Sequence, residues 1–130
     1  MSFLSKFLID GKKYNVLECN YSLSQPMDQV NKPIGRPVGG LITLVVESEK
    51  DTDLFHWMQD PVHTKNGKVV FYKRNAMANL KVLEFTDAFC VKYDEHFVAE
   101  TKSPMTITFT ISARAIKLGD VPYQNLWGLK

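Results

Sequence analysis

Cysteine is scarce in this chain. Only Cys19 and Cys90 are present, and they form no CxxC pair. Small secreted domains that depend on disulfides carry more cysteines, and zinc sites need closely spaced Cys or His ligands. The sequence therefore indicates two free, packed thiols in a reducing compartment.

Long apolar runs and excess charge are missing too. No stretch approaches the ~20 apolar residues of a membrane span, and the net charge of +2 is too small to indicate nucleic acid or an anionic membrane as a partner. The segment MSFLSKFLIDGKKY lacks a basic leader, a long apolar run and a small-residue cleavage site. We therefore expect a protein that is made and folded in the cytoplasm without a signal peptide.

The overall composition is ordinary for a globular protein. Apolar residues make up 45% of the sequence and charged residues 23%. A chain of 130 residues suits a single domain, here residues 1–130, that buries a substantial core.

Residues 39–61 predict a buried strand followed by the one convincing helix of the sequence. Leu41 to Val46 are five aliphatic residues and a threonine, as in a strand covered on both faces. The helix is expected at about residues 51–60, capped by Asp51 or Thr52 and ended by Pro61. Its apolar stripe consists of Leu54, Phe55, Trp57 and Met58. Because so short a helix is marginal alone in water, this stripe must pack on a sheet.

Two turn signals divide strands elsewhere. Asp10–Gly11 predicts a hairpin between residues 3–10 and 13–24, with a bulge near Val16–Leu17. Residues 63–67 end in Asn66–Gly67, the strongest two-residue hairpin signal, and predict a turn before a strand at 68–74.

The second half of the chain alternates between apolar and polar residues over long stretches. Between residues 80 and 98 one face is expected to carry Leu83, Phe85, Phe89, Val91, Tyr93 and Phe97. Asp87 interrupts it, as at a bulge, a bend or a turn. A strand from Met105 follows, with Thr106, Thr108, Thr110 and Ser112 on its polar face, and a change of phase predicts a further bulge near Arg114. The sum is a mainly β fold of about seven antiparallel strands, a barrel or sandwich, with one α-helix.

Two segments lack this periodicity. Residues 25–38, QPMDQVNKPIGRPV, contain three prolines and predict an extended loop, either an arm that docks on a partner or a mobile surface loop. Its apolar residues Met27, Val30, Ile34 and Val38 favour the arm. The tail at about 119–130 is expected to be irregular, although it keeps aromatic residues such as Trp127.

The sequence offers no catalytic constellation. Gly35 to Gly40 has the glycine spacing of a phosphate-binding loop, but Leu41–Ile42 stand where Lys-Ser/Thr is required. The three histidines, His56, His63 and His96, match no metal-ligand spacing. We therefore expect no catalytic residues, no cofactor and no metal, and a protein that is not an enzyme.

Four long stretches resemble the type VI secretion tube protein family, Hcp (TssD), in the form found in Bacteroidota. They are FLSKFLIDGKKYNVLECNYSLSQPMD, GRPVGGLITLVVES, DTDLFHWM and FYKRNAMANLKVLEFTDAFCVKY. The resemblance implies a β-barrel with one helix, similar to phage tail tube proteins. It also implies hexameric rings that stack into a tube, which sheath contraction expels with a spike and effectors. No catalytic residue comes with this family.

The resemblance also implies contact surfaces. Residues 25–38 are expected to contact a neighbouring subunit or the next ring, with Arg36 as the anchor of the stacking contact. The expected interface residues are Pro26, Met27, Ile34, Arg36, Pro37 and Trp127. The expected lumen-facing residues are Thr86, Lys92, Thr106, Thr108 and Thr110.

The implied partners are further copies of the chain in stacked homohexamers, together with sheath, spike or baseplate, and effector proteins. Neither nucleic acid nor membrane insertion is expected, and the protein would leave the cell through the type VI machine. Two alternatives remain open: the tube protein of a phage tail or extracellular contractile injection particle, and a monomeric barrel that binds a small ligand in a closed apolar pocket.

Overall fold

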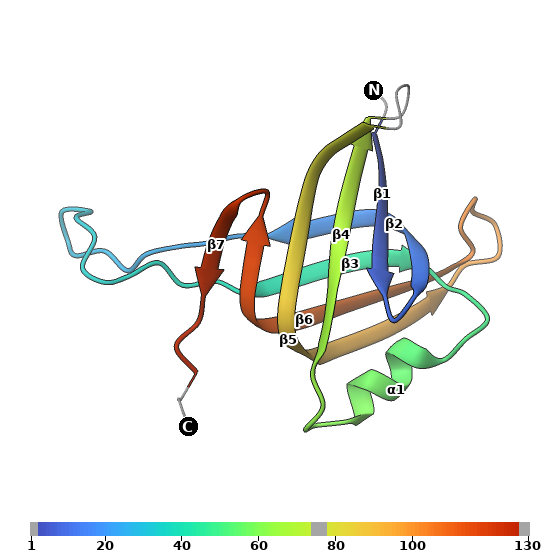
Figure 1. Ribbon diagram of the computed structural model, residues 1–130. Coiled ribbons are helices and arrows are strands. Elements are labelled where there is room, and N and C mark those ends of the chain that lie inside the picture. Colours follow the sequence, from blue (N-terminus) through green and yellow to red (C-terminus); the bar gives the residue numbers. More distant parts are fainter. Residues whose placement is uncertain (1–2, 74–77, 128–130) are drawn as a thin grey trace.

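The computed structural model describes residues 3–73 and 78–127 (Figure 1). Its elements are β1 (Phe3–Ile9), β2 (Lys12–Tyr21), β3 (Leu41–Glu47), α1 (Asp53–Gln59), β4 (Lys65–Lys73), β5 (Ala78–Phe97), β6 (Met105–Leu118) and β7 (Val121–Gln124). Within these two ranges, no helix has the length and apolar character needed to cross a bilayer.

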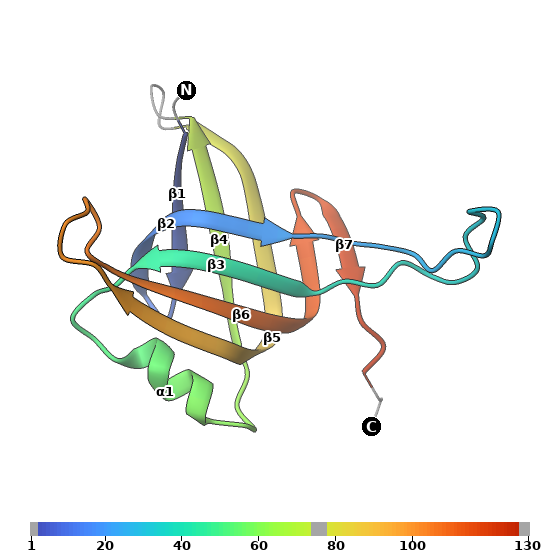
Figure 2. The ribbon, with the colours of Figure 1, turned by 180° about the vertical axis from the view of Figure 1, so that it is seen from behind.

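The strands form a closed antiparallel barrel. Their order is β3-β2-β1-β4-β5-β6-β7, and β3 also pairs with β6, which closes the barrel. The expected β-barrel with one helix is therefore confirmed. The first half of β5 pairs with β4, whereas its second half pairs only with β6. Two layers with different strand directions result, and β5 and β6 run through both (Figure 2).

The corner between these layers lies at Asp87, which has a positive φ of 53°. The pairing of β5 with β6 continues past it without a register shift, so the bulge expected near Arg114 is wrong. Both strands bend together, and the inward-facing side changes in both without a change of register. The register shift lies instead between Cys90 and Lys92.

This bend reverses part of the expected apolar face of β5. Ala88 and Cys90 are buried in the barrel, whereas Val91 is 48% exposed. The expectation that Phe89 and Val91 share the face of Leu83 is therefore wrong. Side chains alternate between faces, so a bend at Asp87 moves the residues that follow it to the opposite side, up to the register shift between Cys90 and Lys92.

The second half of the turn expected at residues 63–67 is wrong. Asn66 and Gly67 lie inside β4, where Gly67 pairs with Ile9 on β1 and Phe85 on β5. A Cβ at Gly67 would lie 2.6 Å from the Leu8 carbonyl oxygen and 2.8 Å from the Phe85 ring. This glycine therefore serves a close approach of strands rather than a turn. The Asp10–Gly11 turn is confirmed, as is the bulge beside Val16.

Side chains fill the barrel interior. Phe7 lies at its centre, with ring centroids 5.3 Å from Phe109 and 5.9 Å from Phe85. Phe7, Phe109, Leu44 and Val69 have no exposed surface. The interior is a packed core, which leaves the monomeric ligand-binding barrel without support at this position.

Helix α1 closes one end of the barrel (Figure 1). Leu54 and Trp57 are 3% and 1% exposed and belong to the barrel core. The N-cap position is Thr52, which makes no side-chain cap hydrogen bond, whereas Asp51 Oδ1 accepts the N–H of Asp53, the first helical residue, at 3.0 Å. The same oxygen accepts the hydroxyl of the buried Tyr14 at 2.8 Å, which ties the helix to β2.

The hydrogen bonds of Asp51 predict a specific loss of stability in acid. Burial opposes ionisation of Asp51, but hydrogen bonds from the Asp53 N–H and Tyr14 hydroxyl, with the nearby Lys12 charge, lower its pKa below the ordinary 3.8. A lowered carboxyl pKa stabilises the fold above about pH 4, and this contribution is lost as the pH falls through the lowered pKa. Asp51→Asn should therefore reduce the urea midpoint at pH 7 and match the parent more closely near pH 3. An equal deficit at both values would contradict the assignment.

Candidate subunit interfaces

Residues 22–40 form an arm that projects from the barrel between β2 and β3 (Figures 1 and 2). At its base, Ser24 and Val38 exchange backbone hydrogen bonds of 3.0 and 2.7 Å. Further out, the Ile34 N–H donates to the Pro26 carbonyl at 2.9 Å. Asp28 closes the far turn, where its Oδ1 accepts the N–H groups of Val30 and Lys32. These bonds make the arm a defined hairpin-like structure.

The arm presents apolar side chains to solvent. Met27, Val30 and Ile34 are 57%, 80% and 64% exposed. Pro26 is exposed as well, and Pro37 is half-buried near the base. Scattered exposed apolar residues are common, but several on one rigid projection are typical of a surface that binds a partner.

The base of the arm is held by a network that sequence reasoning missed. Asn125 Nδ2 donates to the carbonyls of Gly39 at 3.0 Å and Ala113 at 2.9 Å. The Tyr123 hydroxyl donates to Asn125 Oδ1 at 2.7 Å and accepts the Gly39 N–H at 2.9 Å. Gly40, with φ of 100°, brings the chain into β3 beside this network. No local pattern marks these residues, because Gly39 and its partners Tyr123 and Asn125 lie more than 80 positions apart.

Arg36 contacts its own chain at the base of the arm. Its guanidinium donates to the Gln124 carbonyl at 3.0 Å and lies over the Tyr123 ring, 5.7 Å from the centroid. The rest of the side chain is exposed. Arg36 therefore orients the arm against β7, and part of it remains accessible to a partner.

Trp127 contacts β5 of its own chain. Its ring packs on Phe89 of β5, with centroids 5.8 Å apart, and is half-buried there. The tail is also more regular than expected, since Val121–Gln124 form the edge strand β7. Proline is tolerated at position 122 because, on an edge strand, a backbone N–H that points away from the sheet forms no hydrogen bond to another strand.

A four-stranded surface, which we call the wall, consists of β2 from Val16, β3, the first half of β6 and the second half of β5. Thr106, Thr108 and Thr110 lie on its outward face, alternating with the buried Ile107 and Phe109. Lys92 pairs with Thr110. Thr43 joins this face from β3, since its hydroxyl is 3.0 Å from that of Thr110.

Thr86 does not belong to this group. It pairs with Ala115 on the other side of the corner at Asp87, in the layer that contains β4. Of the five residues expected to face a lumen, the structure thus places four on one surface and one elsewhere.

Both margins of the wall are unpaired among the described residues. In β2, the segment from Val16 pairs with β3 alone, and in β5 the segment from Phe89 pairs with β6 alone. Free strand edges present backbone donors and acceptors to any further strand. The wall therefore ends in two edges that a neighbouring chain can extend.

Few side chains in the same part of the chain are suited to metal binding or nucleophilic catalysis. In residues 3–73 and 78–127, no group of three or more His, Cys, Asp or Glu side chains is arranged to hold a metal ion. Cys19 and Cys90 are free, and burial raises the pKa of each thiol to about 11. Thiols with so high a pKa are protonated at neutral pH and poor nucleophiles.

Comparisons with known proteins agree with this picture. The family model for hemolysin coregulated protein Hcp (TssD) matches residues 1–128. Hcp1 from Flavobacterium johnsoniae is 42% identical, with a TM-score of 0.89 over 94% of this chain and 99% of that one. A comparison with curated proteins found no match.

Two more distant structures share the fold. Hcp1 from Salmonella typhimurium is 15% identical, with a TM-score of 0.75 over 91% of this chain and 86% of that one. A chain of the sheath-tube complex of an extracellular contractile injection system, PVC, is 18% identical, with a TM-score of 0.54 over 90% and 87%.

Proposed function

The chain belongs to the hemolysin coregulated protein Hcp (TssD) family, and on this basis we propose that it is the structural subunit of a type VI secretion inner tube. Six copies form a ring, and rings stack into a tube that sheath contraction expels. The observation that carries the proposal is the combination of a rigid, apolar arm with a wall that has two free edges. The 42% identity to an Hcp protein favours this over the tube of another contractile particle, for which only the fold is shared.

The ring forms through the edges of the wall. The β5 edge of one copy meets the β2 edge of the next, so each interface joins two different surfaces. A heterologous contact of this kind closes into a ring when the rotation between copies divides a full turn. The closure also covers edges that would otherwise favour aggregation.

The outward face of the wall then lines the lumen. Its side chains Lys92, Thr106, Thr108 and Thr110 are short or polar, as suits a water-filled passage that carries effectors. Thr86 is left out of this set because it lies beyond the corner at Asp87.

The arm makes the contacts between neighbouring subunits or rings. Pro26, Met27 and Ile34 bury their apolar surface on another copy, while Arg36 and Pro37 hold the base. Trp127 has a packing role against Phe89 in the same chain, and it contributes to an interface only through its exposed part.

The remaining partners follow from this role. The sheath, a spike or baseplate and effector proteins meet the tube from outside, at its end and in its lumen. The protein leaves the cell through the machine and needs no catalytic residue and no cofactor, since its work is mechanical.

Light scattering followed by negative-stain electron microscopy tests the proposal. The purified protein should show a mass near six times 14.9 kDa and appear as a ring with a central hole. The triple variant Met27→Ser, Val30→Ser, Ile34→Ser should keep the parent far-UV spectrum and lose higher assembly, because it removes exposed groups that stabilise only contacts between copies. Val62→Ser, at an exposed apolar residue beyond α1, is the matched control. A parent protein that is monomeric at high concentration would contradict the proposal.

A further inference from the structure

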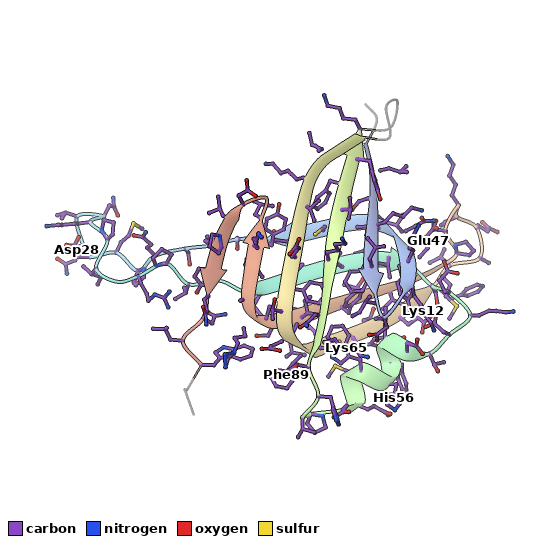
Figure 3. All side chains as sticks on the ribbon, viewed as in Figure 1. Lys12, Asp28, Glu47, His56, Lys65 and Phe89 are labelled. Atoms are coloured by element: carbon purple, nitrogen blue, oxygen red, sulfur yellow. The ribbon has the colours of Figure 1, made fainter. Side chains whose placement is uncertain are left out.

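A second exposed apolar surface lies at the end of the wall opposite to the arm. It consists of Phe97, Val98 and Met105, at the end of the β5–β6 hairpin, and we call it the tip patch. These residues are 63%, 40% and 45% exposed. The arm and this hairpin leave the wall in opposite directions in both views (Figures 1 and 2). Figure 3 shows Asp28 at the end of the arm and Glu47, which contacts the hairpin loop, on the other side.

The tip patch arises because apolar rows of the core run past the end of the barrel. Met105 begins the row of β6 that continues with Ile107 and Phe109, which are 3% and 0% exposed. Phe97, on β5, pairs directly with Met105. An alternating strand normally becomes polar where its cover ends. The described part of the chain provides no cover for these two side chains.

The patch is rigid before any partner arrives. The Val98 N–H donates to the Pro104 carbonyl at 2.7 Å, and the Ser48 N–H donates to the Met105 carbonyl at 3.0 Å. The hydroxyl of Ser103, in the hairpin loop, donates to Glu47 at 2.7 Å. A surface held in this way loses little conformational entropy on binding.

We propose that the tip patch receives the arm of a second copy of this chain. This deepens the proposed function and rests on it. The arm of the same chain leaves the opposite end, so its apolar residues Met27, Val30 and Ile34 are available only to another molecule. Hydrophobic side chains then meet hydrophobic side chains on two preformed surfaces.

Charge supports the same pairing. Three carboxylates flank the patch, at Glu47, Glu95 and Glu100, against one cation of the hairpin loop, Lys102, whereas the arm carries Lys32 near its end. The one acid of the arm, Asp28, already accepts two backbone N–H groups of its own turn. Opposite charges around an apolar centre favour the correct partner and orientation.

This contact has a consequence for the assembly. It joins opposite ends of the wall, so the contact repeats without closing and produces an open stack in which all rings point the same way. Val98 and Met105 lie outside the β5 edge proposed to form the ring, whereas Phe97 belongs to that edge. Stacking and ring formation are therefore separable by substitution.

An apolar groove near the arm base offers the competing acceptor. It has a volume of about 400 Å³, and its lining includes Leu23, Leu118, Val121 and Tyr123. Because it lies at the same end as the arm, an arm bound there would join two rings by like ends. Such a contact closes on itself after two rings. The tip patch allows continued growth, which a tube requires.

Disulfide trapping between copies distinguishes the two acceptors. Ile34→Cys is mixed with Val98→Cys, one of them carrying an affinity tag, and the heterodimer is measured on a non-reducing gel after mild oxidation. The control mixes Ile34→Cys with Val121→Cys in the groove, and the parent protein gives the background of Cys19 and Cys90. We expect on the order of tenfold more heterodimer from the first mixture, because a fixed contact raises the effective thiol concentration.

A second variant keeps the test independent of thiol geometry. Val98→Ser with Met105→Ser should leave the mass near six times 14.9 kDa and abolish stacks in electron micrographs, whereas Val62→Ser should change neither. Rings that form with no Ile34–Val98 cross-link, or with a cross-link to Val121 instead, overturn this inference and leave the proposed function standing. Absence of both rings and cross-link overturns both.

Discussion

Replacing Trp57 with alanine is expected to lower the free energy of unfolding by about 3–5 kcal/mol, the usual cost of removing a large buried aromatic side chain. Trp57 is 1% exposed and closes the end of the barrel with Leu54. A short helix cannot shift to fill so large a cavity, because Asp51 and Tyr14 hold its start. Urea unfolding followed by far-UV circular dichroism measures the loss.

Trp57→Phe is the matched control for this prediction. None of the described residues accepts a hydrogen bond from the buried indole Nε1–H of Trp57. Phenylalanine removes this unpaired donor while it keeps most of the ring, so the cost should stay below about 1.5 kcal/mol. If Phe and Ala were equally damaging, the helix would depend on the indole nitrogen and not on the buried volume.

Replacing Gly40 with alanine is expected to be nearly as disruptive and to act on assembly as well. Its φ of 100° is costly for any residue with a Cβ, by about 1–2 kcal/mol. The new Cβ would also lie 2.3 Å from Asn125 Nδ2 and 2.9 Å from the Ala113 carbonyl oxygen. The backbone oxygen cannot move without breaking the strand pairing, so the base of the arm must shift. Urea unfolding should show a loss of roughly 2–4 kcal/mol in total, and light scattering should show weaker assembly.

Gly119→Ala separates strain from collision. Gly119 also has a positive φ, of 61°, but nothing lies within 4 Å of its ideal Cβ. Its substitution should cost only the backbone term, about 1 kcal/mol, and leave assembly unchanged. Equal effects at Gly40 and Gly119 would show that contact with Asn125 is unimportant for the arm.

Local sequence patterns predicted much of this fold correctly. The Asp10–Gly11 turn, the bulge beside Val16 and the helix over Asp53–Gln59 all depend on residues close together in the chain. Alternation likewise identified the Thr-rich face of β6 that the wall presents. In each case the decisive interactions lie within a few positions, so the pattern contains the information.

The wrong predictions share a different cause. Asn66–Gly67 has the composition of a turn, yet Gly67 is needed where strands β1 and β5 approach closely. The alternation of β5 is interrupted at Asp87, and the side that Phe89 faces beyond this bend depends on how two long strands turn together. Neither the close approach at Gly67 nor the turning of the two strands at Asp87 can be inferred from the residues that are next to it in the sequence.

The sequence by itself determined the strands, the single helix, the Pro-rich arm and, through long matching stretches, the family. Only the tertiary structure decided which surfaces those elements form. It separated Thr86 from the other threonines, tied Gly39 to Asn125 across 86 positions, and placed the arm and tip patch at opposite ends of the wall. The physical reason is that side-chain direction along a strand is a local property, whereas the meeting of two segments depends on the closure of the whole barrel.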